Sequence, residues 1–328
     1  MMETLHGDIF NIRSVNDFNV KAIEIFQWQY ENNPLYRQFT DLLGIIPDQV
    51  SEFHEIPFLP AEFFRTNKIL SGVTGYQSVF RSSGTTGGPV SSHYVHDLAL
   101  YGNSLASCFS RFFGDPAGYC FLALLPSYLE NKNSSLVFMV NRLMEQSGCE
   151  FNGFYLNDFC RLHDQLVKMQ ETGAKVILFG VSFALLDFSE SHPLCFPELT
   201  IIETGGMKGR KEEIVREELH SRLKKAFEVP SVCSEYGMTE LLSQAYSMGN
   251  GIFRSPPWMK VLIADMQDPL SFVDTGKSGI INIIDLANLY SCSFIATKDI
   301  GRMHEDGSFE VLGRLDNSEI RGCSLLYT

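Results

Sequence analysis

A segment rich in hydroxyl groups and glycine, residues 80–95 with the sequence FRSSGTTGGPVSSHYV, is the first part of the chain that could bind a ligand. A strand that runs into such a loop can hold phosphate. Glycine lets the backbone approach closely, successive N–H groups form an anion cradle, and hydroxyls add donors. The order of a Walker A loop is absent. Because serine, threonine and glycine also dominate ordinary turns, a plain strand-to-helix connection is the alternative interpretation.

A second polar group follows an expected strand in SEYGMTE, residues 234–240. It presents the ring of Tyr236, the hydroxyl of Thr239 and the carboxylate of Glu240. The structural alternative is that Glu240 is only an early-helix carboxylate favoured by the helix dipole.

A third group lies in residues 297–322, TKDIGRMHEDGSFEVLGRLDNSEIRG, which contain Asp299 and Arg314. Taken singly, Asp299 could be a turn aspartate and Arg314 a surface strand residue. A glycine turn, ETGGMKG, precedes both groups at residues 203–209. The joint occurrence of these segments favours a binding site over the separate structural explanations.

The composition limits what this site can serve. The chain has 328 residues, of which 45% are hydrophobic and 20% charged, and its net charge is −13. This predicts a large core and excludes a broad nucleic-acid surface. No apolar run is long enough to span a membrane and the first residues show no secretory signal, so we expect a cytoplasmic protein. The eight cysteines form no C-x-x-C pair or zinc spacing, which predicts mostly small buried side chains.

The elements that must position these groups alternate between strand and helix from about residue 76 to residue 240. This alternation predicts an α/β fold with a mostly parallel sheet and helices on both faces. We expect an α/β core at residues 1–250, with a helical lead-in over about 1–55. Short strands separated by Asp/Gly turns predict a β-rich subdomain at residues 251–328.

In their order along the chain, these segments resemble the adenylate-forming superfamily of acyl-CoA synthetases, peptide-synthetase adenylation domains and luciferases. The resemblance implies that superfamily's large N-terminal domain, in which the first loop holds the β- and γ-phosphates of ATP. The tyrosine would stack on adenosine, the threonine would touch the α-phosphate, and the aspartate and arginine would bind the ribose. The implied nucleotide-binding residues are Ser82, Ser83, Gly84, Thr85, Thr86, Gly87, Gly205, Gly206, Tyr236, Gly237, Thr239, Asp299 and Arg314, and Glu240 would help to hold Mg²⁺.

Two departures from the superfamily narrow the prediction. No lysine follows the loop, and the chain stops at Thr328, where most members continue into a small C-terminal domain that carries a lysine needed for adenylation. We therefore expect no such domain, and we expect a basic residue of the large domain to replace the lysine. Lys208 in the glycine turn is the first candidate and His93 the second.

The short chain and several segments are similar to the acyl-protein synthetases of bacterial luciferase operons, the LuxE family. That resemblance implies ATP-dependent activation of a fatty acid to acyl-AMP, transfer to Cys323 as a thioester, and delivery to a partner such as an acyl reductase. Two alternatives stay open: a carboxylate–CoA ligase of the phenylacetate type, and a non-catalytic nucleotide- or acyl-binding subunit. With 26 phenylalanines, the acyl pocket could suit an alkyl or an aryl acid.

Overall fold

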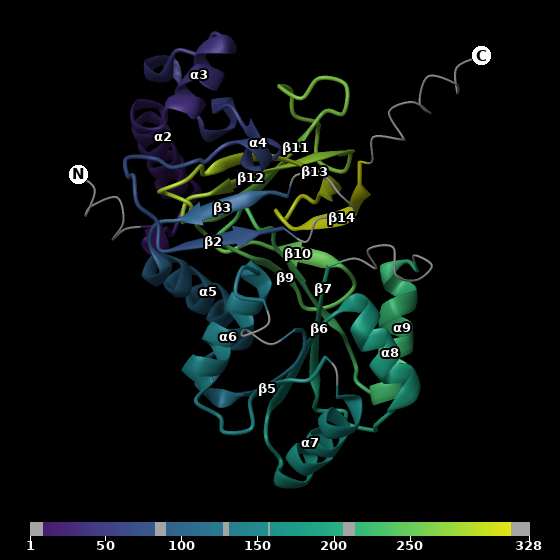
Figure 1. Cartoon of the computed structure of the whole chain (residues 1–328). Coiled ribbons are helices and arrows are strands. Elements are labelled where there is room, and N and C mark those ends of the chain that lie inside the picture. The colour runs from purple at the N-terminus through teal and green to yellow at the C-terminus, as the bar shows by residue number, and fades with distance from the viewer. Residues whose placement is uncertain (1–8, 83–89, 127–130, 157, 206–213, 316–328) are drawn as a thin grey trace. The chain divides into compact units, whose positions relative to one another are not determined.

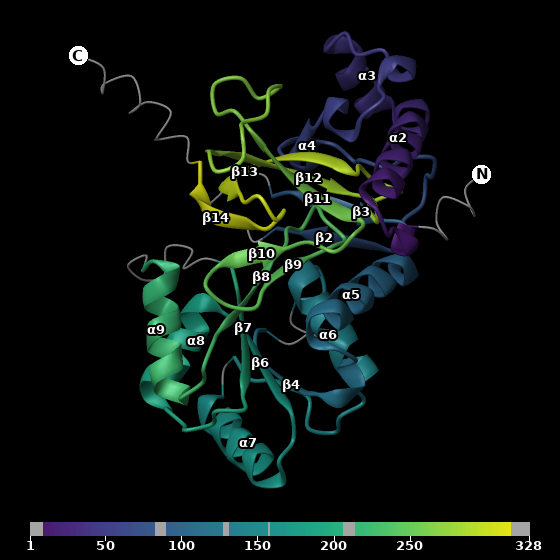
Figure 2. The same ribbon diagram turned by 180° about the vertical axis from the view of Figure 1, so that it is seen from behind.

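A computed structural model describes residues 9–82, 90–126, 131–156, 158–205 and 214–315 (Figures 1 and 2). The chain divides into two compact units. Unit 1 takes residues 1–77, 93–96 and 254–328, and unit 2 takes residues 78–92 and 97–253. The last crossing between the units, at 253/254, lies close to the expected boundary at residue 250. The N-terminal helices, however, group with the C-terminal strands, whereas the sequence prediction joined them to the α/β core.

Unit 2 is built on a sheet with the strand order β10-β9-β8-β7-β6-β4-β5. The strands β5, β4, β6, β7 and β8 pair in parallel, and β9 returns antiparallel to β8. The central strands are buried, which explains why they are almost continuously apolar. Their bounds are β4 Cys120–Leu124, β5 Gly153–Phe154, β6 Val176–Val181, β7 Thr200–Thr204, β8 Cys233–Tyr236, β9 Ala245–Ser247 and β10 Ile252–Arg254.

Helices cover both faces of this sheet. α5 and α6 lie on one side, and α8 and α9 lie on the other (Figures 1 and 2). Residues of α7, α8 and α9 share one hydrophobic core with β4, β6 and β7. The helix ends follow local chemistry: Asp97, Ser134 and Asp158 cap the N-termini of α5, α6 and α7. The bounds are α5 Leu98–Phe113, α6 Ser135–Ser147, α7 Phe159–Thr172, α8 Ser182–Ser191 and α9 Arg216–Phe227.

Unit 1 contains an antiparallel sheet with the order β11-β12-β13-β14, and β1 pairs in parallel with β13. The first long helix, α2, begins at a capping box made by Ser14 and Asp17. It packs on the sheet through Phe26, whose ring meets that of Phe294 at 6.1 Å between centroids. The bounds of unit 1 are α2 Val15–Asn32, α3 Pro34–Leu42, β1 Leu59–Pro60, α4 Phe63–Thr66, β11 Met259–Ala264, β12 Ser278–Asp285, β13 Phe294–Met303 and β14 Phe309–Arg314.

Short elements complete the described chain. Two strands flank the hydroxyl-rich loop, β2 Ser78–Arg81 and β3 Ser92–Val95. The 3-10 turns are η1 Ile9–Asn11, η2 Pro47–Gln49, η3 Phe53–Glu55 and η4 Pro116–Gly118. Within the described residues, no helix is both long and apolar enough to cross a membrane.

The structure departs from the sequence expectations at two helices. The helix α7 was not predicted, although Leu162, Leu166 and Met169 are buried at helical spacing behind the Asp158 cap. Where a loop was expected after β6, α8 begins at once at Ser182. A strand that leads directly into a helix leaves no turn residues for a sequence pattern to reveal.

Candidate active site

Three neighbouring parallel strands of unit 2 end in residues with polar or unusual backbone chemistry. Ser182 follows β6, Gly205 follows β7, and Tyr236 ends β8. In parallel α/β sheets, ligands bind outside the carboxyl ends of the strands. The fold therefore brings two of the predicted motifs, the glycine turn and SEYGMTE, to the same edge of one sheet.

The SEYGMTE segment is largely enclosed. Tyr236 is 9% exposed, and its ring meets that of Phe253 in an edge contact at 6.0 Å. Glu240 is 5% exposed, and Thr239 is half-buried. A Cβ on Gly237 would lie 2.5 Å from Oε1 of Glu235, so a side chain at this position would displace that buried carboxyl group.

Two acidic residues that sequence reasoning missed support this edge. Glu203 on β7 and Glu235 on β8 are both buried. Thr204 donates a hydrogen bond from its hydroxyl to Glu235, and it is also the partner of Glu235 in the β7–β8 register. The available signal was a carboxylate inside an otherwise apolar strand, as in LTIIET, because such a residue needs a specific partner when buried.

Burial raises the pKa of Glu235 to about 7. The hydrogen bond from Thr204 acts to lower this pKa, and the negative charge of Glu203 adds a smaller increase. The folded state therefore holds this proton more tightly than the unfolded chain, whose carboxyl titrates near 4.5. The stability that results is present below pH 4.5 and is lost as the pH rises through 7.

We therefore predict that Glu235→Gln gains stability relative to wild type as the pH rises. The expected gain is roughly 2–3 kcal/mol between pH 5 and pH 8, which is most of the free energy that corresponds to the pKa shift. Urea unfolding of the variant and the wild type at each pH measures the difference in their free energies of unfolding. The titration of groups that both proteins share cancels in this difference. Parallel stability–pH curves would contradict the prediction.

The hydroxyl-rich loop is closed at its base by Ser82 and Ser91. The amide of Ser82 donates to the carbonyl of Ser91, and the amide of Ser91 donates to the hydroxyl of Ser82, both at 3.1 Å. Several predicted residues lie outside the described part of the chain: Ser83, Gly84, Thr85, Thr86, Gly87, Gly206, Lys208 and Cys323. Their assigned roles stay predictions.

The predicted ribose-binding pair belongs to unit 1. Asp299 and Arg314 are partners in the antiparallel register of β13 and β14. Nε of Arg314 lies 3.8 Å from Oδ1 of Asp299, and the arginine side chain is 61% exposed. The fold thus joins two residues that are fifteen positions apart in the sequence into one acid–base pair.

His93 also belongs to unit 1, where it is buried. Its Nε2 lies 3.0 Å from Oδ1 of Asn288, and its ring packs edge-on against Phe64. These contacts account for the histidine as part of a packed interior. Its role in adenylation stays a prediction.

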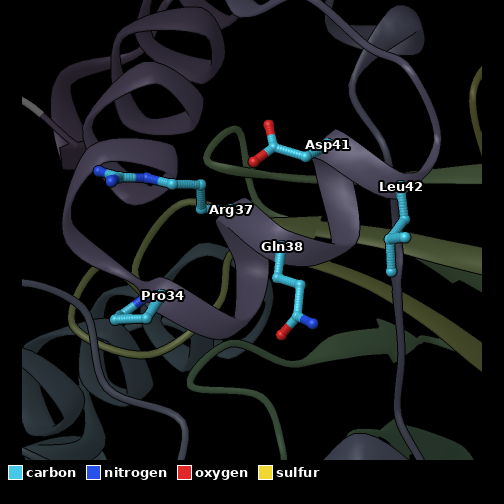
Figure 3. Close-up of a pocket in the computed structure, with 5 residues that line it drawn as sticks. All are labelled: Pro34, Arg37, Gln38, Asp41 and Leu42. Atoms are coloured by element: carbon cyan, nitrogen blue, oxygen red, sulfur yellow. The ribbon is translucent and has the colours of Figure 1, made fainter.

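A depression of about 340 Å³ lies along α3 in unit 1 (Figure 3). Figure 3 shows that all its lining side chains come from that one helix: Pro34, Arg37, Gln38, Asp41 and Leu42. None of the predicted site residues lines it. It is therefore a surface feature of α3 and not part of the candidate active site.

Comparison with known proteins decides the family. The model of the family described as "Acyl-protein synthetase, LuxE" matches residues 144–328, more than half of the chain. The chain belongs to the LuxE family of acyl-protein synthetases. This confirms the resemblance inferred from the motifs. The matched segment includes the glycine turn, SEYGMTE and the β13–β14 pair.

One curated relative shares sequence with this chain, and two solved structures share its fold. The long-chain-fatty-acid–luciferin-component ligase of Vibrio harveyi is 24% identical over an alignment of 332 positions, which covers 92% of this chain and 84% of that protein. A 2-hydroxyisobutyryl-CoA ligase in complex with 2-HIB-AMP and CoA has a similar fold, with a TM-score of 0.68 and 13% identity over 91% of this chain and 70% of its own. ATP-bound MatB from Rhodopseudomonas palustris aligns with a TM-score of 0.54 and 18% identity over 72% of this chain and 47% of its own.

The predicted fold class is thereby confirmed, because the structures that align with this LuxE family member are adenylate-forming enzymes. The protein is an enzyme of the ligase class that activates an acyl group with ATP.

The described residues contain no cluster of three or more His, Cys, Asp or Glu side chains that could hold a metal ion. Proteins commonly bind Mg²⁺ through one or two carboxylates together with substrate phosphates. A single buried carboxylate such as Glu240 fits that arrangement.

Proposed function

We propose that this LuxE family member converts a fatty acid and ATP into acyl-AMP and pyrophosphate, and then transfers the acyl group to Cys323 as a thioester. The observation that carries the proposal is the match of the LuxE model over residues 144–328. The name of the Vibrio harveyi relative supports a long-chain fatty acid as the substrate. An acyl reductase that accepts the thioester is the partner that this chemistry favours.

In each of the two steps one bond forms and one bond breaks. A carboxylate oxygen of the acid attacks the α-phosphorus of ATP, the bond to the β-phosphate oxygen breaks, and pyrophosphate leaves. The thiolate of Cys323 then attacks the acyl carbon, the bond to the AMP oxygen breaks, and AMP leaves with the bonding electrons. Activation is necessary because the oxygen of a free carboxylate is too poor a leaving group for direct attack by a thiol.

Each part of the site has a proposed task in the first step. The loop at residues 82–87 would hold the β- and γ-phosphates through backbone N–H groups and hydroxyls. Tyr236 would lie against the adenosine, and Glu240 would hold Mg²⁺, which neutralises charge on the departing pyrophosphate. Lys208 would replace the lysine that other superfamily members carry in their small domain.

Labelling with fatty acid tests the whole proposal. The protein is incubated with ATP, Mg²⁺ and radiolabelled fatty acid, with and without coenzyme A. Label on the protein that hydroxylamine releases supports the acyl-protein synthetase. Label that appears only on coenzyme A would show a carboxylate–CoA ligase instead, and absence of both products would show a non-catalytic subunit.

The proposed ribose contact gives a prediction for affinity. Asp299→Ala is expected to weaken ATP binding at least about tenfold, because hydrogen bonds to a charged acceptor contribute about 1.5–3 kcal/mol. Isothermal titration calorimetry measures the affinity.

The matched control is Asp306→Ala, which removes the carboxylate that pairs with Arg254 in the same unit. This control variant is expected to bind ATP as the wild type does. Unchanged affinity in Asp299→Ala would remove the aspartate from the nucleotide site.

A further inference from the structure

The buried hydroxyl of Ser182 lies between two hydrogen-bond acceptors, Glu203 and the carbonyl of Gly205, at the carboxyl ends of β6 and β7. Ser182 is the first residue of α8 and is 4% exposed. Its Oγ lies 3.0 Å from Oε2 of Glu203 and also donates to the carbonyl oxygen of Gly205. A hydroxyl has one proton, so Ser182 supplies the donor that two neighbouring acceptors share.

The second oxygen of Glu203 is held by α9. Nε of Arg216 lies 3.3 Å and Nε2 of His220 lies 3.5 Å from Oε1. Burial acts to raise the pKa of Glu203, but the hydrogen bond from His220 and the charge of Arg216 outweigh it and lower the pKa below its ordinary value. The carboxylate is therefore ionised at neutral pH and accepts hydrogen bonds on both oxygens.

This network reaches both motifs at the sheet edge. On one side it ends on the carbonyl of Gly205, in the glycine turn. On the other side His220 also lies 3.4 Å from the hydroxyl of Ser234, the first residue of SEYGMTE. Glu203 thus links the two segments through side chains, in addition to the backbone pairing of β7 and β8.

The carbonyl of Gly205 is the part of this network that matters for ligand binding. Gly205 has φ = +69°, a backbone conformation that favours glycine. A peptide in such a conformation is fixed only when its polar groups are held, and Ser182 holds its carbonyl. This oxygen belongs to Gly205, one of the residues implied to bind the nucleotide, so the contact with Ser182 fixes the backbone at that position.

We infer that Ser182 and Glu203 are positioning residues for the nucleotide: they hold the carbonyl of Gly205 and so set the affinity for ATP and the preference for its adenine base. The inference rests on the proposed function and on the resemblance to the adenylate-forming superfamily, which implies that Gly205 binds the nucleotide. Neither residue needs to touch the ligand. Removing the shared donor leaves the Gly205 carbonyl without the side-chain hydrogen bond that holds it, so the backbone at Gly205 no longer keeps its orientation.

The matched test compares Ser182→Ala with Ser189→Ala. Ser189 lies on the same helix and is equally buried, and among the described residues its hydroxyl donates to the carbonyl of Leu186 within the helix. Ser182→Ala is expected to raise the Kd for ATP about tenfold and to narrow the preference for ATP over GTP by a similar factor. The KM for fatty acid is expected to stay within twofold of wild type in both variants, and Ser189→Ala is expected to keep wild-type ATP affinity.

Thermal denaturation separates this effect from a general loss of stability, which would change both variants alike. If Ser182→Ala does not fold, Ser182→Cys keeps the size of the side chain with only a weak donor and is expected to shift the base preference in the same direction. Wild-type ATP affinity and base preference in the Ser182 variant, or equal losses in Ser189→Ala, would overturn the inference alone. A wild-type protein that binds no ATP would overturn both the inference and the proposed function.

Discussion

Replacing Cys323 with serine is expected to abolish stable acylation of the protein and to leave ATP–pyrophosphate exchange at the wild-type rate. Formation of acyl-AMP uses only the carboxylate and ATP, so it needs no thiol. Thioester formation needs a thiolate, and a serine hydroxyl is not ionised at neutral pH and would need a dedicated base to replace it. Exchange of labelled pyrophosphate into ATP reports the first step, and hydroxylamine-labile label on the protein reports the second.

The structure supplies a demanding control for this experiment. Cys160 is exposed, and its Sγ lies 3.7 Å from Nε2 of His192. An exposed thiol beside an imidazole is the competing site of acylation that the experiment has to exclude. Cys160→Ser is expected to retain full acylation. Peptide mapping that places the acyl group on Cys160, or on any cysteine other than 323, would remove Cys323 from the mechanism.

The second large effect is expected at Glu240. Glu240→Gln keeps the size of the side chain but removes the charge that would hold Mg²⁺. Metal-ion stabilisation of the charge on departing pyrophosphate contributes several kcal/mol, so the exchange rate is expected to fall at least about hundredfold. ATP affinity is expected to change much less, because this charge builds during the reaction.

The comparison requires the exchange rate and the ATP Kd to be measured on the same preparation. Glu145→Gln is the control, because Glu145 is an exposed carboxylate that pairs with Arg142 on α6 of the same unit. It is expected to leave both quantities unchanged. Wild-type exchange in Glu240→Gln would exclude a metal-binding role, and equal losses in rate and affinity would assign Glu240 to ground-state nucleotide binding.

Sequence alone determined the parts of this protein whose chemistry is local. The order of the motifs at residues 80–95, 203–209, 234–240 and 297–322 was sufficient to indicate the adenylate-forming superfamily, because each motif is a short run of residues with a defined task. Similarity of several segments then indicated the LuxE family. The sequence also predicted buried strands, because a parallel strand covered on both faces, such as β4, is apolar along its whole length.

Only the tertiary structure decided which polar residues support the site. Ser182, Glu203 and Arg216 are separated along the chain by 21 and 13 positions, and no local pattern relates them. They meet because parallel strands place their carboxyl ends side by side, and because α8 and α9 cover the same face of the sheet. The same holds for the raised pKa of Glu235, which arises from burial that a sequence does not specify residue by residue.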